Sequence, residues 1–158
     1  MLRIRQAVVA DVPLLRKMIV EFATFEKLQD HVTVTEESLT RDGFGERPRF
    51  HALVPEWDGK AAGYAIYFPF YSSFQGAGLF LEDIYVREEF RGKGVGKALM
   101  AEVGAQALRE GLWAVRWEVL DWNRPAIDFY KRLGAVFLED WKEVRIEGEA
   151  LRRMAGKA

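Results

Sequence analysis

The chain has 158 residues, of which 49% are hydrophobic and 30% are charged, and its formal net charge at pH 7 is -1. A chain of this length can build a full core without disulfides or metals. The balanced charge excludes the cationic field on which sequence-independent nucleic-acid binding depends, and the lack of cysteine excludes disulfides, thiolate metal sites and a cysteine nucleophile.

The start of the chain and its apolar runs bear on its location. The first residues, Met1 to Gln6, lack the apolar run of a signal peptide, and no stretch approaches the roughly 20 apolar residues that span a bilayer. We therefore expect one domain over residues 1–158. We expect it in the cytoplasm, with neither nucleic acid nor a membrane as its partner.

The first third of the chain predicts a strand followed by two helices. Residues Leu2 to Ala7 alternate apolar and polar side chains, which is typical of a strand. Asp11 is placed to cap a helix, whose apolar face recurs at three- and four-residue steps: Leu15, Met18, Ile19, Phe22 and Phe25. A loop follows. Thr35 with two glutamates behind it then predicts the start of a second helix, which Gly43 is expected to end.

Three consecutive strands are predicted next. Residues 50–56 and 61–70 are rich in Ala, Val, Tyr, Ile and Phe, and Trp57-Asp58-Gly59-Lys60 between them is a hairpin turn signal. A third strand is expected over residues 79–86, after a further turn. Strands joined by such short turns pair antiparallel, so this region predicts a meander.

The rest of the chain alternates helices and strands. It predicts a helix over residues 95–110, a strand over 113–120, a helix over 125–133 and a strand pair over 135–138 and 141–146. A strand, a helix and another strand in succession imply a crossover and a parallel pair. The expected fold class is therefore α+β: a mixed, mostly antiparallel twisted sheet with helices on both faces and one parallel strand pair.

Residues Arg91 to Gly96, which read Arg-Gly-Lys-Gly-Val-Gly, lie between the third of these strands and a helix. Glycine lets a backbone approach a ligand closely, and the free amides at a helix start favour an anion such as phosphate. A dinucleotide loop needs glycine at Lys97, and a P-loop needs glycine at Arg91 and Ser or Thr at Ala98, so the sequence fits neither pattern. A glycine-rich turn without a ligand remains the alternative.

The loop and four longer stretches carry a resemblance to a known family. An Arg-Gly-Lys-Gly-Val-Gly loop after an antiparallel strand resembles the pyrophosphate loop of the GNAT acyltransferases, whose pattern is Arg or Gln, two residues, Gly, one residue, and Gly or Ala. The stretches that are similar to the diamine (spermidine/spermine) and thialysine N-acetyltransferase branch are residues 35–46, 81–83, 121–135 and 151–155. The resemblance implies a GNAT-like fold with the parallel pair at the acetyl-CoA cleft. It also implies acetyl-CoA as the acetyl donor, no metal, a small amine substrate and a homodimer.

The resemblance also assigns residues to the cofactor. The backbone amides of Ile84 and Val86 would hold the acetyl carbonyl and the pantetheine arm, the glycine loop would hold the pyrophosphate, and Asn123 with the following turn would border the cofactor. The cofactor-binding residues expected on this basis are Ile84, Tyr85, Val86, Arg91, Gly92, Lys93, Gly94, Val95, Gly96, Lys97, Asn123, Pro125, Ala126 and Tyr130.

Acetyl transfer from a thioester to an amine needs a neutral amine, stabilisation of the oxyanion and a proton for the departing thiolate. The resemblance gives Glu82 the amine's proton, directly or through water, and makes Tyr130 the general acid. It makes four residues the substrate-binding set: Phe25, Glu26, Glu82 and Asp83.

Structural roles compete with these assignments. Tyr130 also lies on a helical stripe that is typical of a core, and Glu82 and Asp83 could be the solvated end of an edge strand. Successive strand residues point to opposite faces, so at most one of the two carboxylates is expected to face a given site. His31 and His51 lack a partner at metal-ligand spacing, and the aromatic run that begins at Tyr67 has no basic groove beside it, so packing or solvent exposure is their expected role.

The expected function is an acetyl-CoA-dependent N-acetyltransferase that acetylates a primary amine of a small cationic substrate: a polyamine, a diamine or a thialysine-like compound. Two alternatives stay open. Acetylation of a protein or peptide amine would need an open groove. A non-catalytic acetyl-CoA-binding module would bind the cofactor without releasing CoA.

Overall fold

The computed structural model describes residues 1–157, and the contacts within the chain divide it into two compact units. The first unit is Met1–Glu118, and the second begins at Val119. The first unit holds the whole sheet and three α-helices, and the second holds two further α-helices. The expectation of a single domain over the chain stays a prediction.

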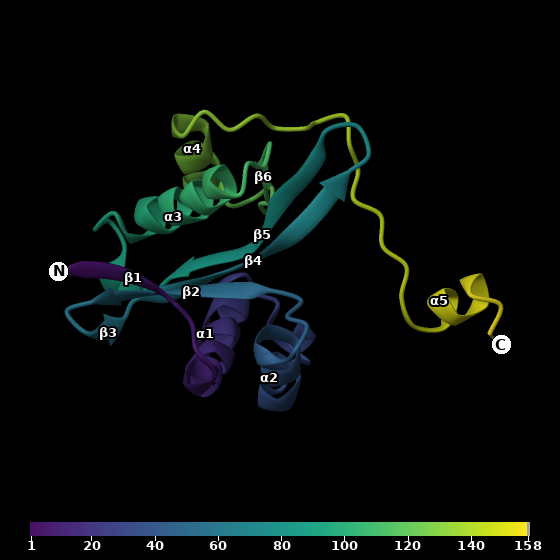
Figure 1. Ribbon diagram of the computed structural model, residues 1–158, viewed down its shortest axis with the longest axis horizontal. Coiled ribbons are helices and arrows are strands. Elements are labelled where there is room, and N and C mark those ends of the chain that lie inside the picture. The colour runs from purple at the N-terminus through teal and green to yellow at the C-terminus, as the bar shows by residue number, and fades with distance from the viewer. Residues whose placement is uncertain (158) are drawn as a thin grey trace. The chain divides into compact units, whose positions relative to one another are not determined.

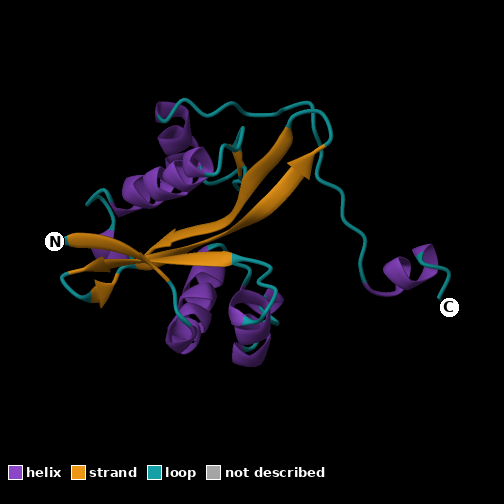
Figure 2. Ribbon diagram, in the orientation of Figure 1, coloured by secondary structure: helices purple, strands orange, loops and turns teal. Residues whose placement is uncertain are grey.

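The first unit is built on a mixed sheet, drawn as arrows in Figure 2. Its strands are β1 Leu2–Gln6, β2 His51–Trp57, β3 Lys60–Ala61, β4 Gly63–Ser72, β5 Gly76–Val86 and β6 Val115–Arg116. They pair in the order β1-β2-β4-β5-β6, with β3 beside β2. All neighbours are antiparallel except β5 and β6, which are parallel, so the predicted meander and parallel pair are confirmed.

Helices cover both faces of this sheet (Figure 1). They are α1 Val12–Phe25, α2 Glu36–Phe44 and α3 Val95–Arg109. Successive residues of β2 point to opposite faces, as pleating requires: Leu53 packs in the core under α3 with Leu99, and Val54 packs in the core over α1 with Leu15. The predicted α+β class with helices on both faces is therefore confirmed.

Strand β5 carries one residue more than the stretch of β4 that faces it. Ile66 pairs with Asp83 and the next residue, Tyr67, pairs with Leu81, so Glu82 is the extra residue of a β-bulge. Leu81 packs in the core under α3, whereas Tyr85 packs in the core over α1. The expectation that only one of Glu82 and Asp83 can belong to a given site assumed regular alternation, and the bulge removes that assumption.

The first hairpin turn follows the sequence signal closely. Trp57 pairs with Lys60, and the two residues between them, Asp58 and Gly59, have φ values of 48° and 77°. Positive φ at both central positions is the geometry of the type I′ turn, which matches the right-handed twist of the flanking strands and favours an Asp-Gly pair.

Of two expected helix boundaries, the first is right in position and the second is wrong. Helix α1 begins directly after Asp11 as predicted, but the Asp11 carboxylate accepts a hydrogen bond from the Val8 N–H at 2.7 Å and pairs with Arg5, so its side chain makes no capping bond to α1. Helix α2 begins after Thr35 as predicted, with the Thr35 hydroxyl accepting from Ser38, but it runs through Gly43 to Phe44. A Cβ at position 43 would collide with the ring of Phe50, so this glycine serves close packing and does not end the helix.

The second unit contains α4 Arg124–Arg132 and α5 Gly148–Met154. The strands expected over residues 135–138 and 141–146 are wrong, because neither stretch has regular structure in the described part of this unit. Alternating side chains do not make a strand without a paired neighbour, and Val136, Trp141 and Val144 are 83%, 79% and 90% exposed. The strand expected over residues 113–120 is likewise reduced to β6. No helix within residues 1–157 is long and apolar enough to cross a membrane.

The start of β4, where Gly63 pairs with Val86, and the turn between β2 and β3 predict a sharp difference between two glycines. A Cβ on Gly63 would overlap the carbonyl oxygen of Tyr85, whereas a Cβ on Gly59 would meet nothing within 4 Å. We expect Gly63→Ala to lower the free energy of unfolding by at least about 2 kcal/mol, as in overpacked cores. Gly59→Ala should cost about 1 kcal/mol, from its left-handed backbone alone. Urea unfolding followed by tryptophan fluorescence measures both, and equal losses would contradict the clash.

Candidate active site

Two further carboxylates, those of Glu26 and Glu82, act electrostatically on Asp83 in the first unit. Asp83 follows the bulge in β5, and its carboxylate accepts a hydrogen bond from the Tyr64 hydroxyl at 2.9 Å. Burial raises the pKa of Asp83 from its ordinary 3.8 to about 6. The negative charges of Glu82 and Glu26 raise the pKa further, against the hydrogen bond from Tyr64, which lowers it. The sequence-predicted Glu26, Glu82 and Asp83 therefore form one electrostatic cluster.

Helix α1 brings Glu26 to this cluster. The helix packs on the face of the sheet that carries Tyr64 and Tyr85, and Glu26 is the residue that directly follows its last turn. Partial burial raises the pKa of the Glu26 carboxyl above its ordinary range. The carboxyl groups of Glu26 and Asp83 are both shielded from water. Each therefore attracts a cationic partner more strongly than an exposed carboxylate does.

Aromatic rings pack around Tyr64, whose hydroxyl donates to Asp83. The rings of Phe22 and Tyr85 stack with centroids 5.5 Å apart, and the centroids of Tyr64 and Tyr85 are 6.0 Å apart. Burial, followed by the charge of Asp83, raises the pKa of the Tyr64 phenol well above 10. Tyr64 is therefore a neutral hydrogen-bond donor at all working pH values. The sequence analysis missed Tyr64. This residue lies outside the stretches that carry the family resemblance, and no local pattern shows that its hydroxyl faces Asp83.

An ion pair anchors the end of β5. The Arg87 guanidinium donates two hydrogen bonds of 2.9 Å to the Glu21 carboxylate of α1, and a third of 3.1 Å to the Ala61 carbonyl. Fork-shaped pairing of this kind fixes orientation as well as distance. It holds the residues just before the glycine loop against α1, so the loop starts from a defined position.

The glycine loop has the conformation that its composition predicts. After a 3-10 turn over Glu88–Phe90, Gly92 and Gly94 have φ values of 72° and 81°, which glycine adopts without strain. Helix α3 begins at Val95, and the first helical hydrogen bond runs from the Ala98 N–H to the Gly94 carbonyl at 3.0 Å. The amides from Val95 to Lys97 precede that bond and lie at the positive end of the helix dipole.

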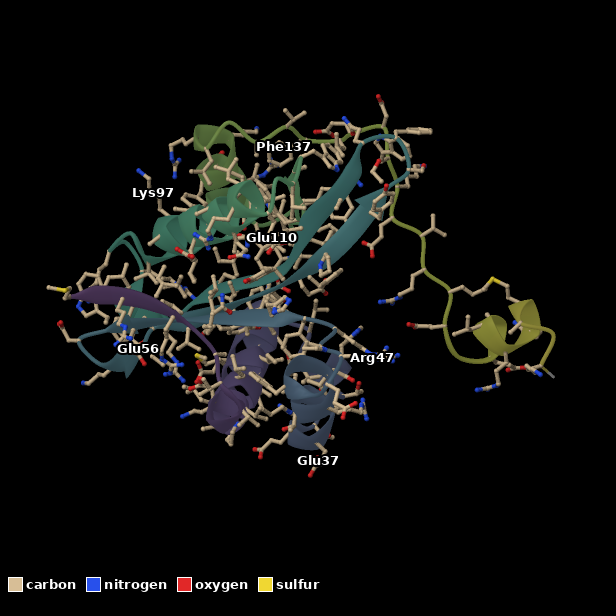
Figure 3. All side chains as sticks on the ribbon, viewed as in Figure 1. Glu37, Arg47, Glu56, Lys97, Glu110 and Phe137 are labelled. Atoms are coloured by element: carbon tan, nitrogen blue, oxygen red, sulfur yellow. The ribbon has the colours of Figure 1, made fainter. Side chains whose placement is uncertain are left out.

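The charged side chains of the loop differ in their surroundings. The Arg91 Nε donates to the Val86 carbonyl at 2.9 Å, and its guanidinium lies 4.8 Å from the ring centroid of Phe25. The Lys93 ammonium lies 5.5 Å from the ring of Trp57. Lys97 extends from the first turn of α3 into solvent (Figure 3). The contact between Arg91 and Phe25 joins the phosphate-type loop to the segment that carries Glu26.

One edge of β5 is open beside this loop. Ile84 and Val86 pair with Ala65 and Gly63 of β4, but the parallel pairing with β6 ends at Phe80. No strand among residues 1–157 pairs with the second edge of β5 from Leu81 to Val86. Unpaired backbone groups on a strand edge are a template for an extended ligand.

The remaining predicted residues belong to the second unit. The Asn123 side chain accepts a hydrogen bond from the Ala126 N–H at 3.4 Å and so caps α4, with Pro125 in the first turn. Tyr130 lies in α4, and its ring centroid is 5.5 Å from that of Phe129. The Tyr130 side chain is buried.

Comparison with known proteins agrees with this geometry. Residues 15–135, well over half of the 158, match the model of the acetyltransferase (GNAT) family. This chain belongs to the GNAT acetyltransferase family. Membership implies acetyl-CoA as the acyl donor, and the loop, the helix start and the open edge of β5 are groups that suit an extended phosphorylated molecule.

Individual relatives cover nearly the whole of this GNAT protein. It is 44% identical to the thialysine N-epsilon-acetyltransferase of Sus scrofa over 98% of this chain and 97% of that one. It is 32% identical to an L-ornithine N5-acetyltransferase of Arabidopsis thaliana, over 95% and 86%. A solved integron cassette protein of V. cholerae has a TM-score of 0.80 at 22% identity, over 98% and 97%, and shows the same fold.

Asp83 predicts an unusual pH dependence of stability. Its folded pKa, about 6, lies above its ordinary 3.8, so its stabilising effect is complete below pH 3.8 and is lost as the pH rises to about 6. Asp83→Asn keeps an oxygen for Tyr64 but cannot ionise. We expect it to be more stable than wild type by about 1–3 kcal/mol at pH 8, and no more stable at pH 3.5.

Denaturant unfolding at both pH values measures this difference. Asp30→Asn, which makes the same chemical change at an exposed position, supplies the control. An Asp83→Asn protein that is less stable than wild type at pH 8 would show that the fold does not disfavour ionisation of the Asp83 carboxyl.

Proposed function

We propose that this GNAT protein transfers the acetyl group of acetyl-CoA to a primary amine of a small cationic substrate, such as a polyamine, a diamine or a thialysine-like compound. The observation that carries the proposal is the acidic cluster formed by the partly buried Glu26 and Asp83 with the exposed Glu82, beside an open strand edge and a glycine loop at a helix N-terminus. The relatives named for thialysine and ornithine support it, since both of these compounds carry a side-chain primary amine.

The donor would be held by backbone groups of the first unit. The amides at the start of α3 and the glycines before them suit the pyrophosphate of CoA, as a helix N-terminus suits phosphate. The backbone of Ile84 and Val86 on the open edge of β5 suits the pantetheine arm and the acetyl carbonyl. An amide that donates to this carbonyl would stabilise the oxyanion that forms when the amine attacks.

Proton transfers complete the reaction. The amine nitrogen would bond to the acetyl carbon to give the tetrahedral oxyanion, and its collapse would break the bond from that carbon to sulfur. Glu82, directly or through a water molecule, would accept the amine proton. Tyr130 would give its phenolic proton to the CoA thiolate, a role that rests on the resemblance of its motif to the family's. A free phenol and a free thiol differ by only about 1.5 pH units in pKa, so this transfer is nearly balanced.

The substrate's charge would be met by the acidic cluster. Above about pH 6 the Asp83 carboxylate is ionised, and with Glu26 and Glu82 it forms a site for ammonium groups. Phe25 adds an apolar surface at the same end of α1. The homodimer expected from the diamine branch is part of the proposal and is tested by the mass of the protein in solution.

A turnover screen tests the function directly. We expect CoA thiol release with thialysine, ornithine, lysine, spermidine and short diamines, because each offers a primary amine and a cationic charge. A lysine-containing peptide should react at least tenfold more slowly at equal concentration. Preference for the peptide would favour protein acetylation, and acetyl-CoA binding without any thiol release would favour a non-catalytic module.

The general-acid assignment predicts a specific loss. Tyr130→Phe keeps the ring beside Phe129 and removes the proton donor. We expect kcat to fall by about 10²–10⁴, with acetyl-CoA affinity by calorimetry little changed. Tyr71→Phe, at a tyrosine that is 78% exposed, serves as the control and should retain full activity. An active Tyr130→Phe enzyme would remove the assignment.

A further inference from the structure

Tyr64 is a fully buried tyrosine whose hydroxyl is committed to the acidic cluster. The side chain is 0% exposed, and Tyr64 faces Tyr85 across the β4–β5 ladder. Its hydroxyl donates to the Asp83 carboxylate at 2.9 Å. A phenylalanine would fill the same space between Phe22 and Tyr85, so the hydroxyl itself calls for an explanation.

The hydroxyl opposes every other influence on Asp83. Burial favours the neutral acid, and the charges of Glu82 on β5 and Glu26 after α1 favour it as well. The hydrogen bond from Tyr64 is the contribution that favours the anion. Tyr85, the other titratable group at the Tyr64 ring, lies near Glu21, Arg87 and Arg91. Without the phenol, Asp83 would be protonated over more of the neutral pH range.

The reaction itself does not account for three acidic groups in one place. The attacking amine must lose its proton before its nitrogen can bond to the acetyl carbon. Once neutral, it no longer has a charge for a carboxylate to balance. One carboxylate suffices to accept that proton, so the remaining negative charge fits a second group of the substrate that stays cationic through the reaction.

We infer that Tyr64 is a positioning residue, which holds the Asp83 carboxylate as an oriented anion and thereby makes the enzyme favour amines that carry a second positive charge. The inference rests on the proposed function for its substrate. It extends that function by assigning the charge preference to Tyr64, which acts through the hydrogen bond of its hydroxyl to Asp83. Tyr64 is assigned no proton transfer to the reacting groups, because its hydroxyl is committed to the Asp83 carboxylate.

The experiment compares Tyr64→Phe with wild type on two matched substrates, 1,5-diaminopentane and pentylamine. At pH 7 we expect kcat/KM for the diamine to fall at least tenfold, while kcat/KM for pentylamine changes less than threefold. The acidic limb of the diamine pH profile should move to higher pH. KM for acetyl-CoA should stay the same. An equal loss with both amines would mean a structural role only and would overturn the inference.

Two further variants sharpen the test. Tyr67→Phe changes another buried tyrosine of β4, which packs under α3, and should leave the preference for the diamine intact. Asp83→Asn should lose that preference as Tyr64→Phe does. The double variant should lose no more than either single variant, because both act through one contact. Additive losses would contradict a shared mechanism.

A measurement without substrate separates this inference from the proposed function. The Asp83 carboxyl can be titrated by carbon NMR in the free protein, where wild type should titrate near pH 6. Tyr64→Phe should titrate at least half a pH unit higher. If the protein acetylates no amine, the proposed function fails, and this titration still decides whether Tyr64 governs Asp83. An unchanged titration overturns the inference even in an active enzyme.

Discussion

The register between β5 and β4 shifts by one residue at Glu82, the extra residue of the bulge. Pleating would otherwise place Leu81 and Asp83 on the same face. The bulge lets Leu81 pack under α3 while Asp83 meets Tyr64 on the α1 face. One strand thereby supplies apolar side chains to both cores, a carboxylate that accepts from Tyr64, and an edge that no described strand covers beyond Phe80. Bulges commonly re-aim side chains next to active sites in this way.

Burial of the Asp83 carboxyl destabilises the fold when that carboxyl is ionised. Its pKa of about 6 shows that the fold disfavours the anion, even though the Tyr64 hydroxyl supports it. Perturbed carboxylates of this kind concentrate at functional sites, since a shielded charge binds an opposite charge strongly. The ion pair of Arg87 with Glu21 and the contact of Arg91 with Phe25 then hold the cluster and the glycine loop together on one side of the first unit.

Local patterns predicted most of the first unit correctly. The Asp58-Gly59 turn, the Thr35 cap and the start of α3 after Gly94 each depend on residues close in sequence. The errors arose where a distant residue decides. Gly43 is small because Phe50 packs against it, and residues 141–146 alternate like a strand although no described strand pairs with them. The local sequence pattern does not show whether a distant residue or strand packs against these positions.

For this protein the sequence alone predicted most elements of the first unit, the glycine loop before α3 and the resemblance to the GNAT family, because turn, cap and motif chemistry depends on residues close in sequence. It also marked Glu26, Glu82 and Asp83 through that resemblance. Only the tertiary structure decided that the three share one electrostatic cluster and that the Tyr64 hydroxyl donates to Asp83. The reason is physical: a hydrogen bond or a pKa depends on distance and burial. Both of these are set by a bulge and by helix packing across the fold.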